Sequence, residues 1–304
     1  MKPIDIIKLI IRVLLGGLFI ATAILKLLSV EEFELYIYSF NLFNFITVVL
    51  LSRLLIAFEL LLGIFLIMKI KYRYTWWLTL FTMVGFTLFL VYVAKFRNDN
   101  NCHCFGALVE LNPVHSICKN ILTIIMLLFV RSEENYRFRF KKLVIGTLIA
   151  AGVIVPFVAN PMDALYNMFY SEEKQINLTV FEELKQDTTL TNFNIDQGNY
   201  ILTFYMSGCK YCKLGMKKLQ SIVEKNEIDE NRIKVMISGS EEGIEGFKTI
   251  TKTENYNFYS LSLITSINLI YGIYPTFVFV EDGKVKKVVD FRGIDEKEVV
   301  EFLK

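Results

Sequence analysis

The stretch NYILTFYMSGCKYC, residues 199–212, decides the fold of the C-terminal half of the chain. Its first residues are rich in β-branched and aromatic side chains, which favours a strand over 199–207. Cys209 and Cys212 follow at once, and 210–224 has a helical composition. A Cys at a helix N-terminus faces free backbone N–H groups, which stabilise its thiolate. We therefore expect Cys209 to be a nucleophile and Cys212 to resolve the mixed disulfide that it forms.

The segments that follow extend this prediction. Strands are expected at 232–238, 276–281 and 284–291, and helices at 241–253 and 296–304. This order, with a proline before the hairpin, resembles the thioredoxin fold over about residues 178–304. The resemblance implies that Pro275 is cis and lies against the active site. It also implies that Tyr274 and Thr276 offer backbone groups to a bound peptide.

The surroundings of the CxxC motif are informative. Lys210 is a positive charge beside Cys209, which favours the thiolate and a more oxidising pair. Gly208 stands where thioredoxin usually has Trp, and Thr203 where it has a buried Asp that assists proton transfer. Both departures argue against a general reductant of the cytosolic kind. A purely structural disulfide and a zinc site are the alternatives, but this half holds no second cysteine pair.

The N-terminal half is much more apolar. The chain has 304 residues, 54% of them hydrophobic, and these concentrate before residue 160. A run of about 18 apolar residues can cross roughly 30 Å of hydrocarbon. Five transmembrane helices are predicted, at 6–28, 42–68, 75–95, 114–130 and 143–159. The net charge of +2 is too small to favour nucleic-acid binding, and five cysteines are too few for a disulfide-stapled scaffold.

Basic residues predict the orientation, because cytoplasmic loops are enriched in Lys and Arg. One set of helix ends carries Lys2, Lys8, Lys69, Lys71, Arg73, Arg131, Arg137, Arg139, Lys141 and Lys142. The opposite ends carry Glu31, Glu32, Glu34, Lys95, Arg97, Asp99 and Glu110. We expect the first set, with the N-terminus, on the cytoplasmic side of a bacterial plasma (inner) membrane. Five spans then place the C-terminal domain and the loop before the fourth span on the outer, periplasmic side.

That outer loop, 98–112, holds a second cysteine pair, Cys102 and Cys104. A disulfide between residues so close would be strained and easy to reduce, which suits a relay. His103 could stabilise a thiolate or accept a proton. A metal site built from these three residues and His115 is the alternative, but the spacing is not a standard one for zinc, and we expect no metal.

Charged residues inside the predicted spans should face a partner or a polar cavity. Arg12, Arg53 and Glu59 lie at membrane depth, and Lys26 lies near the outer end of the first span. Glu59 and Arg12 lie at similar predicted depth on neighbouring helices, so we expect them to pair. Such a pair would either fix the helix register or place a protonatable group beside a quinone. Cys118, one turn inside the fourth span, is either a small buried apolar residue or a third redox thiol.

The string Cys102-His103-Cys104-Phe105-Gly106, followed by Lys119-Asn120, resembles the C-x-C-F-G motif of the MauE family, a branch of the DoxX-like membrane proteins. Parts of the first two spans, 12–26 and 59–63, are similar to that family as well. The resemblance covers about residues 6–130. It implies a four-helix bundle and a role in disulfide formation, first associated with methylamine dehydrogenase maturation. The bundle is also similar in plan to vitamin K epoxide reductase-like quinone enzymes.

The predicted fold class is therefore a membrane α-helical bundle followed by an α/β thioredoxin-like domain. The bundle has a four-helix MauE/DoxX-like core and a fifth transmembrane helix. The expected boundaries are 1–133 for the bundle, 134–177 for the fifth helix and linker, and 178–304 for the thioredoxin-like domain.

These features predict a membrane-bound thiol–disulfide oxidoreductase. Thiols exchange disulfides by direct sulfur attack, so electrons could pass from outer protein thiols to Cys209/Cys212 and then to Cys102/Cys104. The bundle resemblance implies a membrane quinone as the final acceptor. Two alternatives stay open: a reductase that runs in the opposite direction, and a non-catalytic maturation or assembly factor for outer proteins. Membrane lipid and protein thiols are the expected partners, and nucleic acid is not.

Overall fold

The computed structural model describes residues 3–97, 101–106, 109, 111–131, 141–163, 174–187, 190 and 193–304. The chain divides into two compact units, residues 1–37 with 46–161 and residues 38–45 with 162–304. Lys2, Asp99, Glu110, Arg137 and Arg139, which entered the orientation prediction, lie outside the described residues. So do 134–140 and 164–173 of the predicted linker. The predicted fifth helix groups with the other apolar helices.

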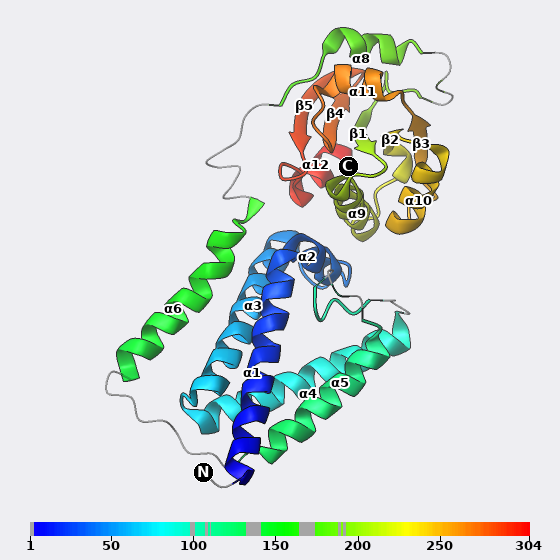
Figure 1. Cartoon of the computed structure of the whole chain (residues 1–304). Coiled ribbons are helices and arrows are strands. Elements are labelled where there is room, and N and C mark those ends of the chain that lie inside the picture. Colours follow the sequence, from blue (N-terminus) through cyan, green and yellow to red (C-terminus); the bar gives the residue numbers. More distant parts are fainter. Residues whose placement is uncertain are drawn as a thin grey trace. The chain divides into compact units, whose positions relative to one another are not determined.

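The first unit is helical (Figure 1). Its elements are α1 (Pro3–Leu28), α2 (Val30–Tyr38), α3 (Phe45–Met68), α4 (Tyr72–Phe96), α5 (Pro113–Phe129) and α6 (Lys141–Ala159). Within the described residues, four segments are long and apolar enough to cross a membrane: α1, α3, α4 and 142–159 of α6. The remaining predicted span, α5, is an apolar helix of 17 residues. The acidic loop expected after the first span instead forms the short helix α2.

Two glycines let α1 and α3 approach closely. A Cβ added to Gly16 would lie 2.7 Å from the carbonyl oxygen of Gly63, and one added to Gly63 would lie 2.6 Å from that of Gly16. Small residues permit this kind of backbone contact in membrane bundles. The contact fixes which residues of the two helices lie opposite each other.

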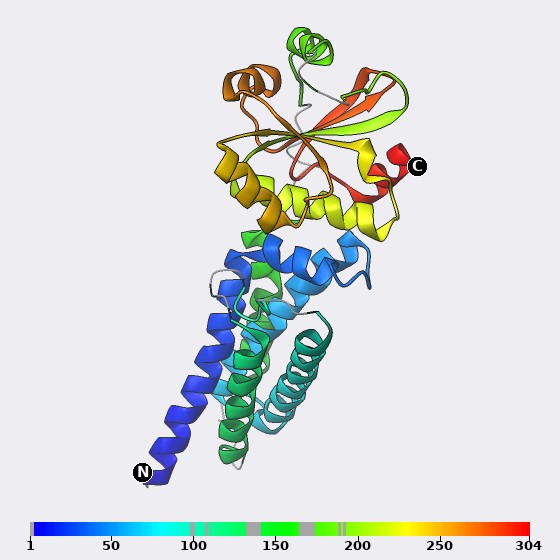
Figure 2. The ribbon, with the colours of Figure 1, turned by 90° about the vertical axis from the view of Figure 1, so that its right-hand side faces the viewer.

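The helices α4 and α5 lie side by side (Figures 1 and 2). Trp76 Nε1 donates to the carbonyl of Leu127, and the Tyr72 hydroxyl donates to that of Val130, both at 2.8 Å. Both acceptors lie at the end of α5, where helix carbonyls run out of i+4 donors; the Leu127 carbonyl also accepts from the N–H of Val130 at 3.3 Å. Leu15 of α1 and Leu66 of α3 belong to the same buried apolar cluster.

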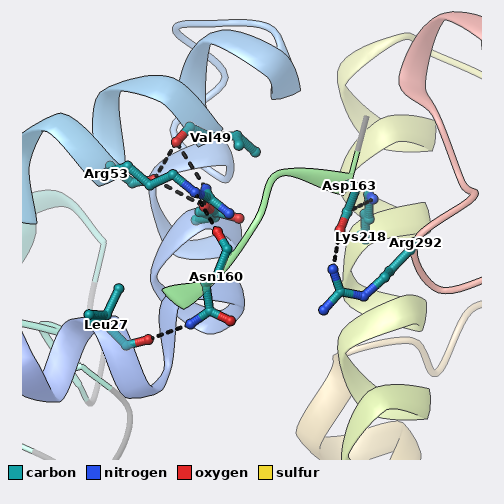
Figure 3. A network of polar contacts seen from close by, with 9 residues as sticks. Leu27, Val49, Arg53, Asn160, Asp163, Lys218 and Arg292 are labelled. Atoms are coloured by element: carbon teal, nitrogen blue, oxygen red, sulfur yellow. Dashed lines mark hydrogen bonds and ion pairs between the residues drawn. The ribbon is translucent and has the colours of Figure 1, made fainter. Parts of the chain in front are cut away.

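The residue after α6, Asn160, fastens that helix to its neighbours. Its carbonyl accepts from Arg53 Nε at 3.1 Å, and its amide donates to the carbonyl of Leu27 at 2.9 Å. Arg53 also donates to the carbonyl of Val49 at 3.1 Å, and Figure 3 shows these contacts. Within α6, a Cβ added to Gly152 would lie 2.7 Å from the side chain of Leu61 in α3.

The second unit is built on a five-stranded sheet of order β3-β2-β1-β4-β5. The strands are β1 (Asn199–Met206), β2 (Ile233–Ser238), β3 (Asn257–Ser260), β4 (Thr276–Glu281) and β5 (Lys284–Asp290). The helices are α8 (Leu178–Lys185), α9 (Lys210–Lys225), the 3₁₀ turn η1 (Glu230–Arg232), α10 (Glu241–Thr251), α11 (Leu263–Ile270) and α12 (Glu296–Leu303). β1, β2 and β3 are parallel, and β4 and β5 form an antiparallel hairpin beside β1. This is the predicted thioredoxin-like arrangement, with β3 and α11 in addition to the elements expected.

Helices cover both faces of the sheet (Figure 2). Alternate residues of β1 point to opposite sides. Leu202 and Phe204 pack with Phe181 of α8 and Leu269 of α11. Tyr205 packs on the other face, against α10 and β4. Helix α9 begins just after β1, so Cys209 lies at the carboxyl end of the central strand of the sheet.

A polar contact joins the start of this unit to its core. Asp163 lies 3.4 Å from the ammonium group of Lys218 and 3.6 Å from the guanidinium group of Arg292 (Figure 3). Lys218 belongs to α9 and is only 1% exposed. Its ammonium group also lies 5.4 Å from the ring centroid of Phe291. Asp163 thus supplies a counter-charge to a buried cation.

Candidate functional site

Cys209 is the N-cap of α9. The strand β1 ends at Met206, the N–H of Cys209 donates to the Met206 carbonyl at 3.0 Å, and the helix begins at Lys210. The sulfur of Cys209 accepts from the backbone N–H of Cys212 at 3.2 Å. The position is therefore the helix N-terminus that the sequence predicts.

The two thiols of this pair have opposite pKa shifts. A hydrogen bond from the Cys212 thiol, supported by backbone N–H groups and the Lys213 ammonium, lowers the pKa of Cys209 to about 6. The same hydrogen bond and burial raise the pKa of Cys212 far above its usual value. Cys212 is fully buried, and Cys209 is partly exposed. Cys209 can thus attack as a thiolate while Cys212 keeps its proton. The sequence analysis did not identify Lys213, and the role of Lys210 beside Cys209 stays a prediction.

The loop before β4 lies against the start of α9. The Tyr274–Pro275 peptide bond is cis, as predicted. A Cβ on Gly215 of α9 would lie 3.2 Å from the ring of Pro275, so the proline packs on that helix. The Thr276 hydroxyl donates to the carbonyl of Ile273 at 2.6 Å, which braces the loop. The contribution of Tyr274, Pro275 and Thr276 to peptide binding stays a prediction.

The two residues that depart from the usual thioredoxin sequence are Thr203 in β1 and Gly208 just before Cys209. Thr203 is fully buried in β1, as is Tyr205 two residues on. Burial raises the pKa of the Tyr205 phenol well above its usual value, so it stays neutral. An added Cβ on Gly208 would meet no atom within 4 Å, which leaves room above Cys209.

The second pair lies in the loop between α4 and α5. Cys102 is 3% exposed, and its sulfur lies 3.0 Å from the hydroxyl of Ser116. The backbone N–H of Cys104 donates to the same sulfur at 3.4 Å. Asn112 and Pro113 set the start of α5, which places Ser116 in its first turn. Ser116 was not predicted, because the Asn-Pro start of the helix gives its place in the first turn of α5 but not the return of the loop onto that turn.

The electrostatics of this pair mirror those of the first. A hydrogen bond from the Cys104 thiol lowers the pKa of Cys102 to about 6, helped by the Ser116 hydroxyl and Lys119 against burial. Donating that hydrogen bond, together with burial, raises the pKa of Cys104 far above its usual value. The ammonium groups of Lys119 and Lys26 oppose this rise. All five cysteines of the chain are free thiols in this structure.

The rest of the C-x-C-F-G segment holds the loop in place. The ring of His103 stacks on Tyr36 of α2, with centroids 4.3 Å apart and planes inclined by 18°. Gly106 has a φ of +67°, and a Cβ there would lie 2.6 Å from the carbonyl oxygen of Leu25. The Lys119 ammonium lies 4.5 Å from the Phe105 ring centroid. The cysteines are thus fixed against α1, α2 and α5.

The buried charges pair differently from our prediction. Glu59 pairs with Lys26 at 2.5 Å and not with Arg12. The reason is the contact between Gly16 and Gly63, which sets the register of the two helices and leaves Arg12 toward the other end of α1. Arg53 pairs with Glu34 of α2.

Two further predictions concern residues of α5. Cys118 is exposed, so its interpretation as a small buried residue is wrong, and a redox role for it stays a prediction. His115 is exposed as well. Among the residues that the structure describes, His, Cys, Asp and Glu side chains form no cluster of three or more that could hold a metal ion.

The chain is similar to known proteins in sequence and, over part of its length, in structure. Protein TlpB of Flavobacterium psychrophilum is 26% identical over 266 residues, which cover 71% of this chain and 72% of TlpB. A secreted disulfide oxidoreductase of Mycobacterium tuberculosis, described as homologous to DsbE of E. coli, is 14% identical with a TM-score of 0.29. It covers 36% of this chain and 82% of its own. Residues 4–132 match the family model of methylamine utilisation protein MauE, and the sheet of the second unit has a thioredoxin-like strand order.

Proposed function

We propose that this multi-pass membrane protein is a thiol–disulfide oxidoreductase that carries electrons through two cysteine pairs. In this proposal Cys209/Cys212 oxidises extracytoplasmic protein thiols. Cys102/Cys104 receives the electrons and gives them to a membrane quinone.

The observation that carries the proposal is a shared asymmetry of the two pairs. In each pair one pKa is lowered to about 6 and the other is raised. The rate of thiol–disulfide exchange depends on the thiolate fraction of the attacking sulfur, and a low-pKa thiol is also a good leaving group. A disulfide that only stapled the fold would need neither property.

The steps balance as two successive exchanges. A client thiolate attacks Cys209 in the Cys209–Cys212 disulfide, and a second client thiol closes the client disulfide and releases the reduced pair. The Cys209 thiolate then attacks one sulfur of the Cys102–Cys104 disulfide and forms a mixed disulfide with it. Cys212 attacks Cys209 in that mixed disulfide, which restores the Cys209–Cys212 disulfide and releases the reduced loop pair. The loop pair now holds the two electrons and the protons of the client.

Five crossings fit this scheme and place both pairs in the periplasm, with the N-terminus in the cytoplasm. The 17 residues of α5 span about 25 Å at 1.5 Å per residue, and a bilayer thins locally around a short helix. Lys69 and Lys71 between α3 and α4, Arg73 in the first turn of α4 and Arg131 after α5 then lie on the cytoplasmic side.

The residues beside the loop pair fit a quinone. Lys26 is flanked by the rings of Phe33 and Phe86, each 5.4 Å from its ammonium group. Aromatic rings can stack on a flat quinone ring, and an ammonium group can donate to a carbonyl oxygen. One oxygen of the neighbouring Glu59 accepts no hydrogen bond. When bound, the quinone would supply the two-electron oxidation of the loop thiols.

The test is the in vivo redox state of Cys209 and Cys212, measured by thiol alkylation and gel shift. The wild type is compared with a Cys102→Ser/Cys104→Ser variant, and Cys118→Ser is the matched control. We expect the Cys209 pair to accumulate in the reduced form in the double variant and to be unchanged in the control.

A more oxidised pair would reverse the direction and favour a reductase. No change would show that the two pairs do not exchange electrons. If client binding and maturation survived Cys209→Ser, a non-catalytic assembly role would replace the oxidoreductase.

A further inference from the structure

Two of the ion pairs that the structure describes in the helical unit are buried, and they differ in how many of their polar atoms have hydrogen-bond partners. In the first, Arg53 of α3 meets Glu34 of α2. The Ser52 hydroxyl also donates to Glu34 at 3.2 Å, and Arg53 donates to the carbonyls of Val49 and Asn160. Such a network is suited to holding helices together.

The second pair, Lys26 of α1 with Glu59 of α3, is less complete. Both side chains are buried, Glu59 to 2% exposure, and Lys26 Nζ lies 2.5 Å from Glu59 Oε1. The other oxygen, Oε2, is buried and accepts no hydrogen bond. A buried carboxylate oxygen without a donor is destabilising, so a purely structural role does not explain it.

This incomplete pair belongs to a charged cluster at the loop cysteines. Lys119 of α5 interacts electrostatically with Cys104, Cys102, Lys26 and Glu59. Lys26 acts on the Cys104 thiol as well. Among the described residues, this cluster holds the ammonium groups of Lys26 and Lys119, the thiols of Cys102 and Cys104, and the Glu59 carboxyl group. The rings of Phe33 from α2 and Phe86 from α4 also lie against Lys26.

Closing the loop disulfide requires a proton acceptor in this cluster. Cys102 reacts as a thiolate, but Cys104 still carries its proton, and that proton must leave when the S–S bond forms. Both ammonium groups already carry their full set of protons. Cys102 spends its thiolate on the new S–S bond, whereas Oε2 of Glu59, beside Lys26, is a buried acceptor with unused lone pairs.

We propose that Glu59 is a positioning residue for the loop pair that accepts the Cys104 proton through Lys26 as the Cys102–Cys104 disulfide closes. The inference rests on the proposed function and extends it. The bond that forms is S–S and the bond that breaks is the Cys104 S–H. Two electrons leave with the oxidant, of the quinone class in the cell, and the proton moves to the carboxylate, which later gives it up to the reduced oxidant.

The experiment measures disulfide closure in the full-length protein in detergent. Cys118, Cys209 and Cys212 are replaced by Ala so that the loop pair alone reports. The reduced protein is mixed either with diamide, a soluble dithiol oxidant, or with decylubiquinone, and closure is followed by quenched alkylation and mass spectrometry from pH 6 to 9. Glu59→Gln keeps the shape and the acceptor for Lys26 but loses the base. Glu34→Gln, in the satisfied pair, is the matched control.

We expect Glu59→Gln to slow closure by diamide at least tenfold at pH 7, since general bases typically contribute 10²–10⁴-fold. The deficit should narrow as pH rises and hydroxide removes the proton instead. Glu59→Asp should recover part of the rate, and Glu34→Gln should match the unmodified protein. If Glu59→Gln is poorly folded, Lys26→Gln/Glu59→Gln removes both charges and carries the same expectation.

Equal rates for Glu59→Gln and its parent at every pH would overturn the proposal, as would equal slowing by Glu34→Gln. Slowing with decylubiquinone alone would also overturn it, because Glu59 would then act on the quinone. If the Cys102–Cys104 disulfide of the parent protein formed with diamide but not with decylubiquinone, the proposal of a quinone as oxidant would be wrong. The diamide result would still test the role of Glu59.

Discussion

The backbone N–H of Cys212 lies 3.2 Å from the sulfur of Cys209, so the nucleophile caps its own helix. The thiol of Cys212 adds a second donor to the same sulfur, and it is the largest cause of the lowered pKa. The reactivity of Cys209 therefore depends on its partner as well as on the helix.

The first prediction follows from this dependence. In the reduced protein, alkylation of Cys209 by iodoacetamide should rise with a midpoint near pH 6, because the pKa of Cys209 is about 6. Cys212→Ala removes the thiol donor and should raise that midpoint toward the ordinary thiol value of about 8.5. Peptide-resolved mass spectrometry of the alkylated protein measures both values. Cys118→Ala is the control, and an unchanged midpoint in Cys212→Ala would contradict the assigned cause.

The second prediction concerns stability and pH. Because the folded pKa of Cys209 lies below its unfolded value, the thiolate stabilises the folded, reduced protein. This contribution is complete above about pH 8.5, the unfolded pKa, and is lost as pH falls toward about 6. Urea unfolding of the reduced protein, followed by pulse proteolysis, should show it as a difference from Cys209→Ser that grows between pH 6 and 8.5. A difference that shrank over that range would show the opposite sign.

The third prediction tests the missed residue of the loop site. Ser116→Ala removes a hydroxyl that helps to lower the pKa of Cys102. The alkylation midpoint of Cys102 should move upward from about 6, while that of Cys209 should not change. Ser116→Thr keeps the hydroxyl and should restore the midpoint. If Ser116→Ala and Ser116→Thr behaved alike, the hydroxyl would have no part in the effect.

The fourth prediction concerns Gly106. Ala there would adopt an unfavourable positive φ and push its Cβ against the backbone of α1. Gly106→Ala should lower the thermal midpoint and increase the labelling of Cys102, because the loop would have to move off the helix. Gly17→Ala, where an added Cβ meets nothing within 4 Å, is the matched control and should leave both unchanged. Differential scanning fluorimetry in detergent and thiol labelling give the two readouts.

The fifth prediction addresses the buried cation of the second unit. Asp163→Ala removes a carboxylate 3.4 Å from Lys218, and losing a charged partner of a buried group costs about 1–3 kcal/mol. The unfolding free energy of the second unit, measured by pulse proteolysis in urea, should fall by that amount. Glu301→Ala breaks an exposed pair with Lys297 and should change it by less than about 0.5 kcal/mol. Equal effects of the two replacements would mean that Asp163 contributes no more than a surface charge.

The elements with a strong local pattern were predictable. β1 follows from its run of β-branched and aromatic residues, α9 from the CxxC position, and the β4–β5 hairpin from the turn at Asp282 and Gly283. β3 was missed because it has only four residues, and α11 because it has only eight, none of them charged. Hydrophobic periodicity cannot identify segments as short as β3 and α11.

The membrane site shows a different limit. Depth along a span can be read from sequence, but which charges meet depends on where two helices touch. The Gly16–Gly63 contact sets that register, and it placed Lys26 rather than Arg12 at Glu59. Ser116 was missed for a similar reason, because its proximity to Cys102 arises from the return of the loop onto α5.

The burial of Cys102 affects how readily the loop thiols are oxidised by molecules other than their intended acceptor. In the second unit the sulfur with the lowered pKa belongs to the partly exposed Cys209, but in the loop it belongs to a residue that is 3% exposed. Oxidation by peroxide and other small solutes follows thiolate character and exposure together. Burial of the Cys102 thiolate therefore slows its oxidation by peroxide relative to that of Cys209, so that fewer electrons of the loop pair are lost before they reach their intended acceptor.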